Sequence, residues 1–365
     1  MFDVIVVGAG PGGSMAAKKC ADYGMKVLVL ERRKLPRDKN CSGLIMKPWC
    51  ENIIREEFGE EIPRRVLASP YWLKGYMLHL PGIEPQKVEV RQGYSRRRDL
   101  DYWLSQKAKD NGAEIWEKAK VIGVSQSDGG CRVQLIKAKE RQELKSRFVI
   151  GADGANSIVR KSIFPRLRLR LVPSFREEFK GQVDIDKDYY HWFHPTGQFR
   201  PRFQCNNKGD GVFMLESTVK RAKWPDMTRT LLDYGFDPTQ EPFCKFGCLH
   251  PLFYTELISG SFVPVKGNIF LVGDAAGLLS HLGPDGIGAA MKSGISAVTS
   301  VIKACRTGKS AAEIYLQELE PIIAKLKMVV AQVKRIEERA RCGGPKEVSE
   351  ALRQGWEESQ NADLT

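Results

Sequence analysis

Three glycines near the start of the chain have the spacing of a phosphate-binding turn. Gly8, Gly10 and Gly13 follow an apolar stretch at 4–7, which predicts a β-strand. The first glycine allows a tight turn, the second leaves room for a pyrophosphate, and the third permits close packing of the next helix. The free N–H groups at the start of that helix would bind the phosphates. The pattern predicts a dinucleotide site on a βαβ unit.

An acidic residue completes this unit. A second apolar strand is expected at Lys26–Leu30, and it stops at Glu31. A carboxylate in this place accepts hydrogen bonds from an unphosphorylated adenosine ribose. The βαβ unit by itself allows either FAD or NAD.

Two later segments extend the pattern. In 147–160 (RFVIGADGANSIVR), a short strand ends before Asp153 and a helix follows. In 267–294, a strand runs into Gly273 and Asp274. A carboxylate such as Asp274, at the end of a buried strand, can hold a ribityl hydroxyl. The order and spacing of the segments favour a flavoprotein.

The helix of the last segment is expected to begin at Pro284, because proline suits a first helical position. Its first turn contains Gly286 and Gly288, which let the helix terminus approach a flat ring. The positive end of the helix would favour negative charge on that ring, as in a reduced, anionic flavin.

Bulk properties are those of a globular protein that can hold two domains. Of the 365 residues, 42% are hydrophobic and 28% are charged. No apolar run reaches the ~18 residues that span a bilayer, so we expect a cytoplasmic protein. The nine cysteines are scattered, which favours reduced thiols. Cys244, Cys248 and His250 lack zinc-knuckle spacing, and no metal is predicted.

The formal net charge is +13, which bears on partners. No nucleic-acid-binding module is visible, so nucleic acid is not expected. An ordinary solvated surface, an acidic protein and an anionic membrane surface at the inner face all fit this charge.

The segments together resemble FAD proteins of the p-hydroxybenzoate hydroxylase type, and within them the geranylgeranyl reductase family. The discriminating stretch is 36–44 (PRDKNCSGL), which resembles that family's proline, lysine, cysteine and small-residue signature. Arg97, Leu100 and Asp101 also match, as does the glycine-rich segment from 273 to 294. The resemblance covers residue 1 to about 308.

The resemblance implies an α/β fold with a Rossmann-type FAD-binding domain, an inserted, mainly antiparallel β-sheet substrate domain and a C-terminal helical segment. The FAD domain would comprise residues 1–68, 95–165 and 262–308, and the substrate domain 69–94 and 166–261. Residues 309–365 would form the helical segment.

The resemblance also implies which residues form the site. Contacts to FAD are expected from Gly8, Gly10, Gly12, Gly13, Glu31, Arg32, Cys41, Ser42, Arg97, Val121, Asp153, Gly273, Asp274, Gly286 and Ile287. Tyr190, Trp192 and His194 would line the substrate pocket, and Cys41 and His194 are the candidate catalytic residues.

The substrate side departs from the family. The related reductases often carry Tyr-x-Trp-x-Phe-Pro-Lys, whereas His194 stands here in place of the Phe and Thr196 in place of the Lys. A histidine makes an aromatic wall more polar and adds a group that can donate a proton. The change weakens the expectation of a long polyprenyl substrate.

Further elements are expected from patterns in the second half. Strands are predicted at Lys180–Asp184, Tyr190–Phe193 and Gly211–Ser217, within the substrate domain. The segment 321–340 reads as an amphipathic helix packed on its own domain. The polar tail from about Val348 is expected to be frayed.

The leading hypothesis is an FAD-dependent reductase of carbon–carbon double bonds in a hydrophobic, isoprenoid-like substrate. Electrons would come from NAD(P)H or from reduced ferredoxin, an acidic protein that the basic surface could dock. The alternative is an FAD monooxygenase that hydroxylates an aromatic or other small substrate with NAD(P)H and O2. Electron transfer to a quinone and a non-catalytic FAD-binding protein are further alternatives.

Overall fold

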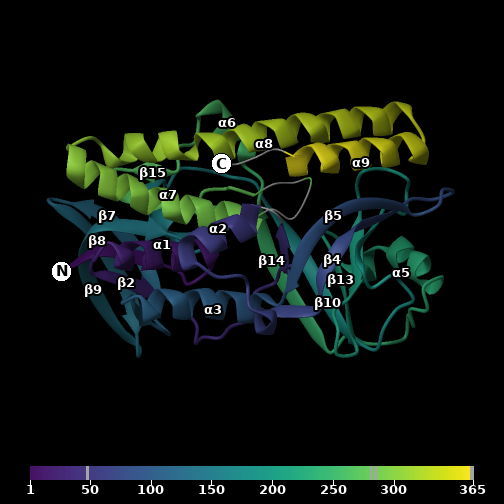
Figure 1. Ribbon diagram of the computed structural model, residues 1–365, viewed down its shortest axis with the longest axis horizontal. Helices are drawn as coiled ribbons and strands as arrows, with labels where there is room; N and C mark the ends of the chain where they lie inside the picture. The colour runs from purple at the N-terminus through teal and green to yellow at the C-terminus, as the bar shows by residue number, and fades with distance from the viewer. Residues whose placement is uncertain (47–48, 280–281, 283–285, 362–365) are drawn as a thin grey trace.

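Two β-sheets lie side by side and share a layer of helices along one long side of the molecule (Figure 1). In this computed structural model the described residues are 1–46, 49–279, 282 and 286–361. Pro284, where the sequence predicts a helix start, and the neighbouring Asp285 lie outside them. The helix itself is present from Gly286.

The first sheet, called sheet A, carries the dinucleotide motifs. Its strands are β1 (Phe2–Val7), β2 (Val27–Leu30), β6 (Glu114–Trp116), β7 (Lys120–Ser127), β8 (Gly130–Lys137), β9 (Glu140–Gly151), β15 (Val265–Lys266) and β16 (Ile269–Leu271). The order is β15-β16-β9-β1-β2-β6, with β7 and β8 added as an antiparallel extension of β9. Strands β16, β9, β1, β2 and β6 run parallel, so their glycine and acidic ends meet at one edge.

The second sheet, called sheet B, is mainly antiparallel. Its strands are β3 (Leu44–Met46), β4 (Leu67–His79), β5 (Gln86–Ser95), β10 (Leu171–Lys180), β11 (Tyr189–Phe193), β12 (Phe203–Asn207), β13 (Val212–Ser217) and β14 (Cys244–Pro251). The order is β14-β10-β13-β12-β11-β4-β5-β3, and β4 with β11 is a parallel pair. The sheet therefore combines segments that lie far apart in the sequence, including β3 from beside the candidate Cys41.

The strands predicted at Tyr190–Phe193 and Gly211–Ser217 are confirmed as β11 and β13. The strand predicted at Lys180–Asp184 is wrong, because β10 ends at Lys180. Gly181 follows with a φ of +101°, a left-handed conformation that ends the extended run.

Helices cover both sheets. They are α1 (Pro11–Asp22), α2 (Trp49–Phe58), α3 (Arg97–Asp110), α4 (Ile158–Ile163), α5 (Pro225–Leu232), α6 (Tyr254–Ser259), α7 (Gly286–Thr307), α8 (Ala311–Cys342) and α9 (Pro345–Asn361), with short 3-10 turns at Arg64–Val66, Arg221–Lys223 and Gly273–Ala275. Helix α1 packs against both α3 and α7, and α7 packs against α8. The predicted amphipathic helix at 321–340 is confirmed as part of α8, whose apolar face is buried.

The described part of the C-terminal tail, up to residue 361, is a helix rather than a frayed segment. Helix α9 runs back along α8 and lies over β5 (Figure 1). Val348, Leu352 and Trp356 are buried in a cluster with residues of sheet B. The polar composition of the tail hid these apolar positions, whose spacing of four places them on one helical face.

Candidate functional site

A single cavity of about 1080 Å³ joins the glycine-rich edge of sheet A to one face of sheet B. This volume slightly exceeds the usual range of small-molecule sites, which ends near ~1,000 Å³. The predicted site residues that line it are Gly8, Gly10, Gly12, Glu31, Arg32, Cys41, Ser42, Arg97, Val121, Asp153, Tyr190, Trp192, Gly273, Asp274, Gly286 and Ile287. Gly13 and His194 are not among the lining residues.

The glycines of the first turn divide into packing and lining positions. A Cβ on Gly13 would lie 1.9 Å from the Gly8 carbonyl oxygen, and one on Gly12 would lie 2.7 Å from the Ala290 oxygen on α7. A Cβ on Gly10 would instead have Arg37 Nη2, at 3.8 Å, as its nearest contact. Gly13 is therefore required by helix packing, whereas Gly10 leaves open space where a pyrophosphate can approach the start of α1.

The acid after β2 is fixed by its neighbours. Glu31 is buried and accepts hydrogen bonds from the backbone N–H groups of Ala9 (3.1 Å) and Arg33 (2.9 Å). Arg37 Nε also donates to it at 3.1 Å, while Arg37 Nη1 reaches Asp101 at 3.1 Å. The carboxylate is thus held at the cavity wall in an orientation suited to a ribose. Arg37 was missed from the sequence, where it is one of several basic residues after β2.

Arg97 lies at the start of α3. Its guanidinium makes two hydrogen bonds to the fully buried Asp101, at 2.8 and 3.0 Å, and also contacts the Cys41 thiol. Burial lowers the pKa of Arg97, but Asp101 and the Cys41 thiol raise it, so its net pKa lies above the ordinary value. The group therefore stays cationic and is aimed at the loop that carries Cys41.

Asp153 follows β9 and caps a helix. Its Oδ2 accepts hydrogen bonds from the backbone N–H groups of Ile158 (2.6 Å) and Val159 (3.2 Å) at the start of α4. Oδ1 is buried and has no partner among the residues that the structure describes. Burial raises the pKa of Asp153, although these hydrogen bonds and one with Ser157 lower it. The unpartnered oxygen is an acceptor that a cofactor hydroxyl could fill.

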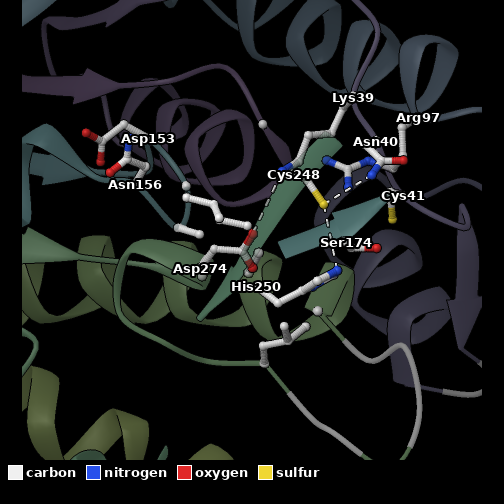
Figure 2. Close-up of a pocket in the computed structure, with 18 of the residues that line it drawn as sticks. Lys39, Asn40, Cys41, Arg97, Asp153, Asn156, Ser174, Cys248, His250 and Asp274 are labelled. Carbon is white, nitrogen blue, oxygen red and sulfur yellow. Dashed lines mark hydrogen bonds and ion pairs between the residues drawn. The ribbon is translucent and has the colours of Figure 1, made fainter. Parts of the chain in front are cut away.

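The end of β16 and the start of α7 form the opposite wall. A Cβ on Gly273 would lie 2.8 Å from the Ala290 methyl, and one on Gly286 would lie 2.7 Å from Leu279. Asp274 lies 4.0 Å from Lys39 Nζ and is partly exposed to the cavity (Figure 2). The start of the 22-residue helix α7, at Gly286 and Ile287, also lines the cavity, so its dipole favours negative charge there.

Two cations, one on β10 of sheet B and one directly after β12, hold the loop between these walls. Arg176 Nη1 on β10 donates to the Cys41 carbonyl at 2.6 Å, and Lys208 Nζ donates to the Ser42 carbonyl at 3.0 Å. Lys208 is buried, and burial together with nearby Arg176 lowers its pKa to about 7. The loop that the sequence assigns to the cofactor is therefore attached to residues of β10 and of the turn after β12.

The end of the cavity beside β11, called the substrate end because the sequence predicts the substrate pocket there, is aromatic and basic. Tyr190 and Trp192 lie on β11, and the Tyr190 hydroxyl donates to Gln204 at 3.3 Å. The Arg202 guanidinium stacks on Trp192 at 4.3 Å from the ring centroid. Burial and neighbouring Arg200 lower the pKa of Arg202 to about 9. Burial therefore disfavours the charged form of this guanidinium, and a bound anion beside it would stabilise that charge.

The placement of His194 corrects the sequence-based assignment. Its side chain is buried, and Nδ1 is 3.0 Å from the Gln198 carbonyl oxygen, to which it donates. Burial and nearby Arg202 lower the pKa of His194 to about 3, so the imidazole is neutral near pH 7. Outside the cavity wall and uncharged, His194 is not positioned to give a proton to a substrate.

Several cavity residues were not found from the sequence. Lys39 and Asn40 precede Cys41, Arg202 directly precedes β12, Glu216 lies on β13, and Cys248 and His250 lie on β14. Cys248 and His250 alternate on β14, which is the signal that could have paired them. No cluster of three or more potential metal ligands occurs among the described residues.

Comparison with known proteins agrees with this geometry. Residues 84–168 match an FAD binding domain, and residues 6–36 match an NAD(P)-binding Rossmann-like domain. A digeranylgeranylglycerophospholipid reductase of Methanosarcina acetivorans is 26% identical over 89% of this chain and 80% of its own length. A geranylgeranyl diphosphate reductase of Rhodobacter capsulatus is 27% identical over 85% of this chain and 77% of its own length. The chain is thus similar in sequence to proteins named as geranylgeranyl reductases over most of its length.

A solved structure shows that the fold is shared as well. A geranylgeranyl bacteriochlorophyll reductase-like protein from Thermoplasma acidophilum superposes with a TM-score of 0.79 at 21% identity, covering 98% of this chain and 96% of that one. The predicted α/β, FAD-binding Rossmann-type fold is confirmed. The protein is an FAD-dependent oxidoreductase.

The described residues fit FAD. Gly10 leaves open space at the phosphate turn, and the buried Asp153 oxygen lacks a partner in the described part of the chain. Asp274 and the start of α7 would hold the ribityl chain and ring, with Glu31 at the adenosine ribose. None of the helices in the described part of the chain is long and apolar enough to cross a membrane.

Proposed function

We propose that this enzyme reduces carbon–carbon double bonds in an isoprenoid chain that carries a phosphate-bearing group. The observation that carries the proposal is the continuity of the cavity from Gly10 and Asp274 to Trp192 and Arg202. Bound FAD, when reduced, supplies a hydride. The relatives are named for a diphosphate and a phospholipid substrate, both of which combine an apolar chain with an anion.

The chain's own residues would bind both parts of such a substrate. Tyr190 and Trp192 offer an aromatic face to the isoprenoid chain. Arg170, Arg200 and Arg202 also line the cavity and offer cations to a phosphate. Closure of the apolar part around the chain would exclude water from the reacting carbons.

Proton supply is the remaining requirement. Cys41 lines the cavity beside Arg97 and stays a candidate donor, since its backbone is anchored by Arg176. His194 no longer qualifies because it is buried away from the cavity.

The test is an anaerobic turnover with defined substrates. The protein is loaded with FAD, reduced, and given geranylgeranyl diphosphate or an unsaturated archaeal-type phospholipid. Products are expected to gain the mass of two hydrogens for each double bond reduced. Rapid oxygen consumption with hydroxylated product on addition of aromatic compounds would instead support the monooxygenase alternative and overturn the proposal.

A charge variant sharpens this test. Arg202→Met is expected to raise the KM for the diphosphate by about tenfold or more, because a charge-assisted contact to the anion is lost. Arg166→Met is the matched control, since Arg166 is exposed and does not line the cavity. Equal KM values for the two variants would place the anion elsewhere.

We also propose that the basic surface receives an acidic electron donor such as reduced ferredoxin, or rests on an anionic membrane. The support is the net charge of +13. Reduction by ferredoxin would slow steeply as ionic strength rises, while reduction by NAD(P)H would not. Sedimentation with anionic but not neutral vesicles would identify the membrane contact.

A further inference from the structure

A cysteine and a histidine on the edge strand β14 face the cavity together. Cys248 and His250 are two positions apart, so their side chains project from the same face of the strand. Cys248 pairs across the sheet with Ser174 on β10, and both residues line the cavity. The pair therefore faces the loop that carries Cys41 from the substrate side.

The Cys248 sulfur has two polar partners (Figure 2). Asn40 Nδ2 donates to it at 3.3 Å, and His250 Nε2 lies 3.7 Å away. The amide occupies a lone pair of the sulfur, and the thiol proton can be shared with the imidazole. Asn40 also precedes Cys41, so the thiol is held at a fixed position relative to the cofactor loop.

The surroundings keep this thiol protonated. Burial raises the pKa of Cys248 to about 11; Lys39 and the Asn40 hydrogen bond lower it, while Glu216 and Cys41 raise it. At neutral pH Cys248 is therefore a thiol, which can give a proton, rather than a thiolate nucleophile. By contrast, the Cys41 thiol is in contact with the Arg97 guanidinium.

We propose that Cys248 is the proton donor for double-bond reduction and that His250 returns the proton to it. The proposal rests on the proposed function. The Cys248 S–H bond would break as its proton forms a C–H bond on one carbon of the double bond, while the neighbouring carbon would take the hydride that reduced FAD supplies. The thiolate then takes a proton from the His250 imidazolium, which is reprotonated from water. An imidazole suits this exchange near neutral pH.

The groups that face the pair set its pH dependence. Lys39 and Asn40 come from the loop after β2, Ser174 from β10 and Glu216 from β13. Ser174 Oγ donates to Glu216 Oε1 at 3.1 Å, so a residue of β10 fixes the orientation of this carboxylate. The thiol is thus placed between one cation and one carboxylate.

The first test is single-turnover reduction of the diphosphate substrate by the FAD-loaded, pre-reduced protein. Cys248→Ala is expected to slow the chemical step by about 100-fold, the usual contribution of a positioned acid. FAD affinity and thermal stability should stay at wild-type values. Cys244→Ala is the matched control, because Cys244 lies on the same strand but does not line the cavity.

The second test does not depend on turnover. The rate of Cys248 alkylation by iodoacetamide is followed against pH in FAD-free protein, with the modified peptide identified by mass. The profile of the wild type is expected to differ from that of His250→Asn, because only the wild type has an imidazole in contact with the Cys248 sulfur. Identical profiles for the two proteins would overturn the pairing.

The outcomes separate the inference from the function on which it rests. If wild-type protein reduces no isoprenoid, the proposed function fails, and the alkylation profiles still decide whether the pair shares a proton. If the wild type reduces its substrate and Cys248→Ala does so at the same rate, the proton-donor inference alone is wrong.

Discussion

The two ends of the cavity are built in different ways. At the cofactor end, Gly8 and Gly13 fit because their backbones pack within van der Waals contact of one another and of the adjoining loop. At the substrate end, Trp192 on β11 meets Arg202, which directly precedes β12, because β11 and β12 pair in register across sheet B. A sequence motif can specify the first arrangement, whereas the second depends on pairing between distant strands.

The largest effects on folding and on FAD binding are expected from replacing glycines at the cofactor end of the cavity. Gly13→Val would force a side chain into the Gly8 carbonyl, 1.9 Å from the added Cβ, so the variant should not yield folded protein. Gly10→Val should fold normally but bind FAD at least about 100-fold more weakly, because only the pyrophosphate space is filled. Thermal melting of the FAD-free proteins and FAD titration distinguish the two. Equal FAD affinity in Gly10→Val and the wild type would contradict the assignment.

A smaller effect is expected where helix α9 supports the substrate end. Trp356 is 1% exposed and packs edge-on against Tyr76, with Trp192 of the cavity wall 5.7 Å away between ring centroids. Trp356→Ala should lower the free energy of unfolding by about 3–5 kcal/mol, the usual cost of removing a buried large aromatic side chain. Chemical denaturation measures this change.

Helix α9 also supplies a control. Arg353→Ala changes an exposed residue of the same helix and should leave stability within about 0.5 kcal/mol of the wild type. FAD affinity in folded Trp356→Ala should be unchanged, since Trp356 does not line the cavity. Weaker FAD binding by a Trp356→Ala protein of unchanged stability would show that α9 also affects the cofactor end of the cavity.

The smallest effect concerns the pH dependence of stability at His194. The folded-state pKa of about 3 lies below the ordinary value of 6.5, so only the unfolded chain gains this proton between those pH values. Stability is therefore full above pH 6.5 and is lost as pH falls toward 3, by about 2 kcal/mol at pH 5. His194→Phe, which keeps an aromatic ring but removes the titrating group, should remove that part of the slope. Denaturation midpoints at pH 7 and pH 5 check this, and an unchanged slope would mean that His194 is not buried as described.

The same contrast explains what the sequence could predict. The βαβ unit and the strand before Asp274 were recognisable because their chemistry depends on short, local spacing. From the sequence, Cys248 and His250 were considered only as metal ligands, and no metal was predicted. Nothing in their local sequence indicates that β14 faces Asn40, over 200 positions earlier in the chain. His194 was misassigned because alternation along a strand cannot tell a cavity from the packed space beside it.

Helix α9 was missed for a different physical reason. Polar residues dominate its sequence, and only Val348, Leu352 and Trp356 show the apolar spacing. Its stability comes from contact with α8 and sheet B rather than from its own composition.

The hydrogen bond from Lys208 to the Ser42 carbonyl comes from a group whose charge depends on pH. With its pKa lowered to about 7, this side chain changes its charge within the physiological range. An amine nitrogen can donate its hydrogen bond in either protonation state, so the loop beside the cofactor keeps its anchor. What changes is the electrostatic potential at that loop, which becomes more positive as the solution becomes more acidic. The charge beside this loop therefore depends on pH, whereas the hydrogen bond to the Ser42 carbonyl does not.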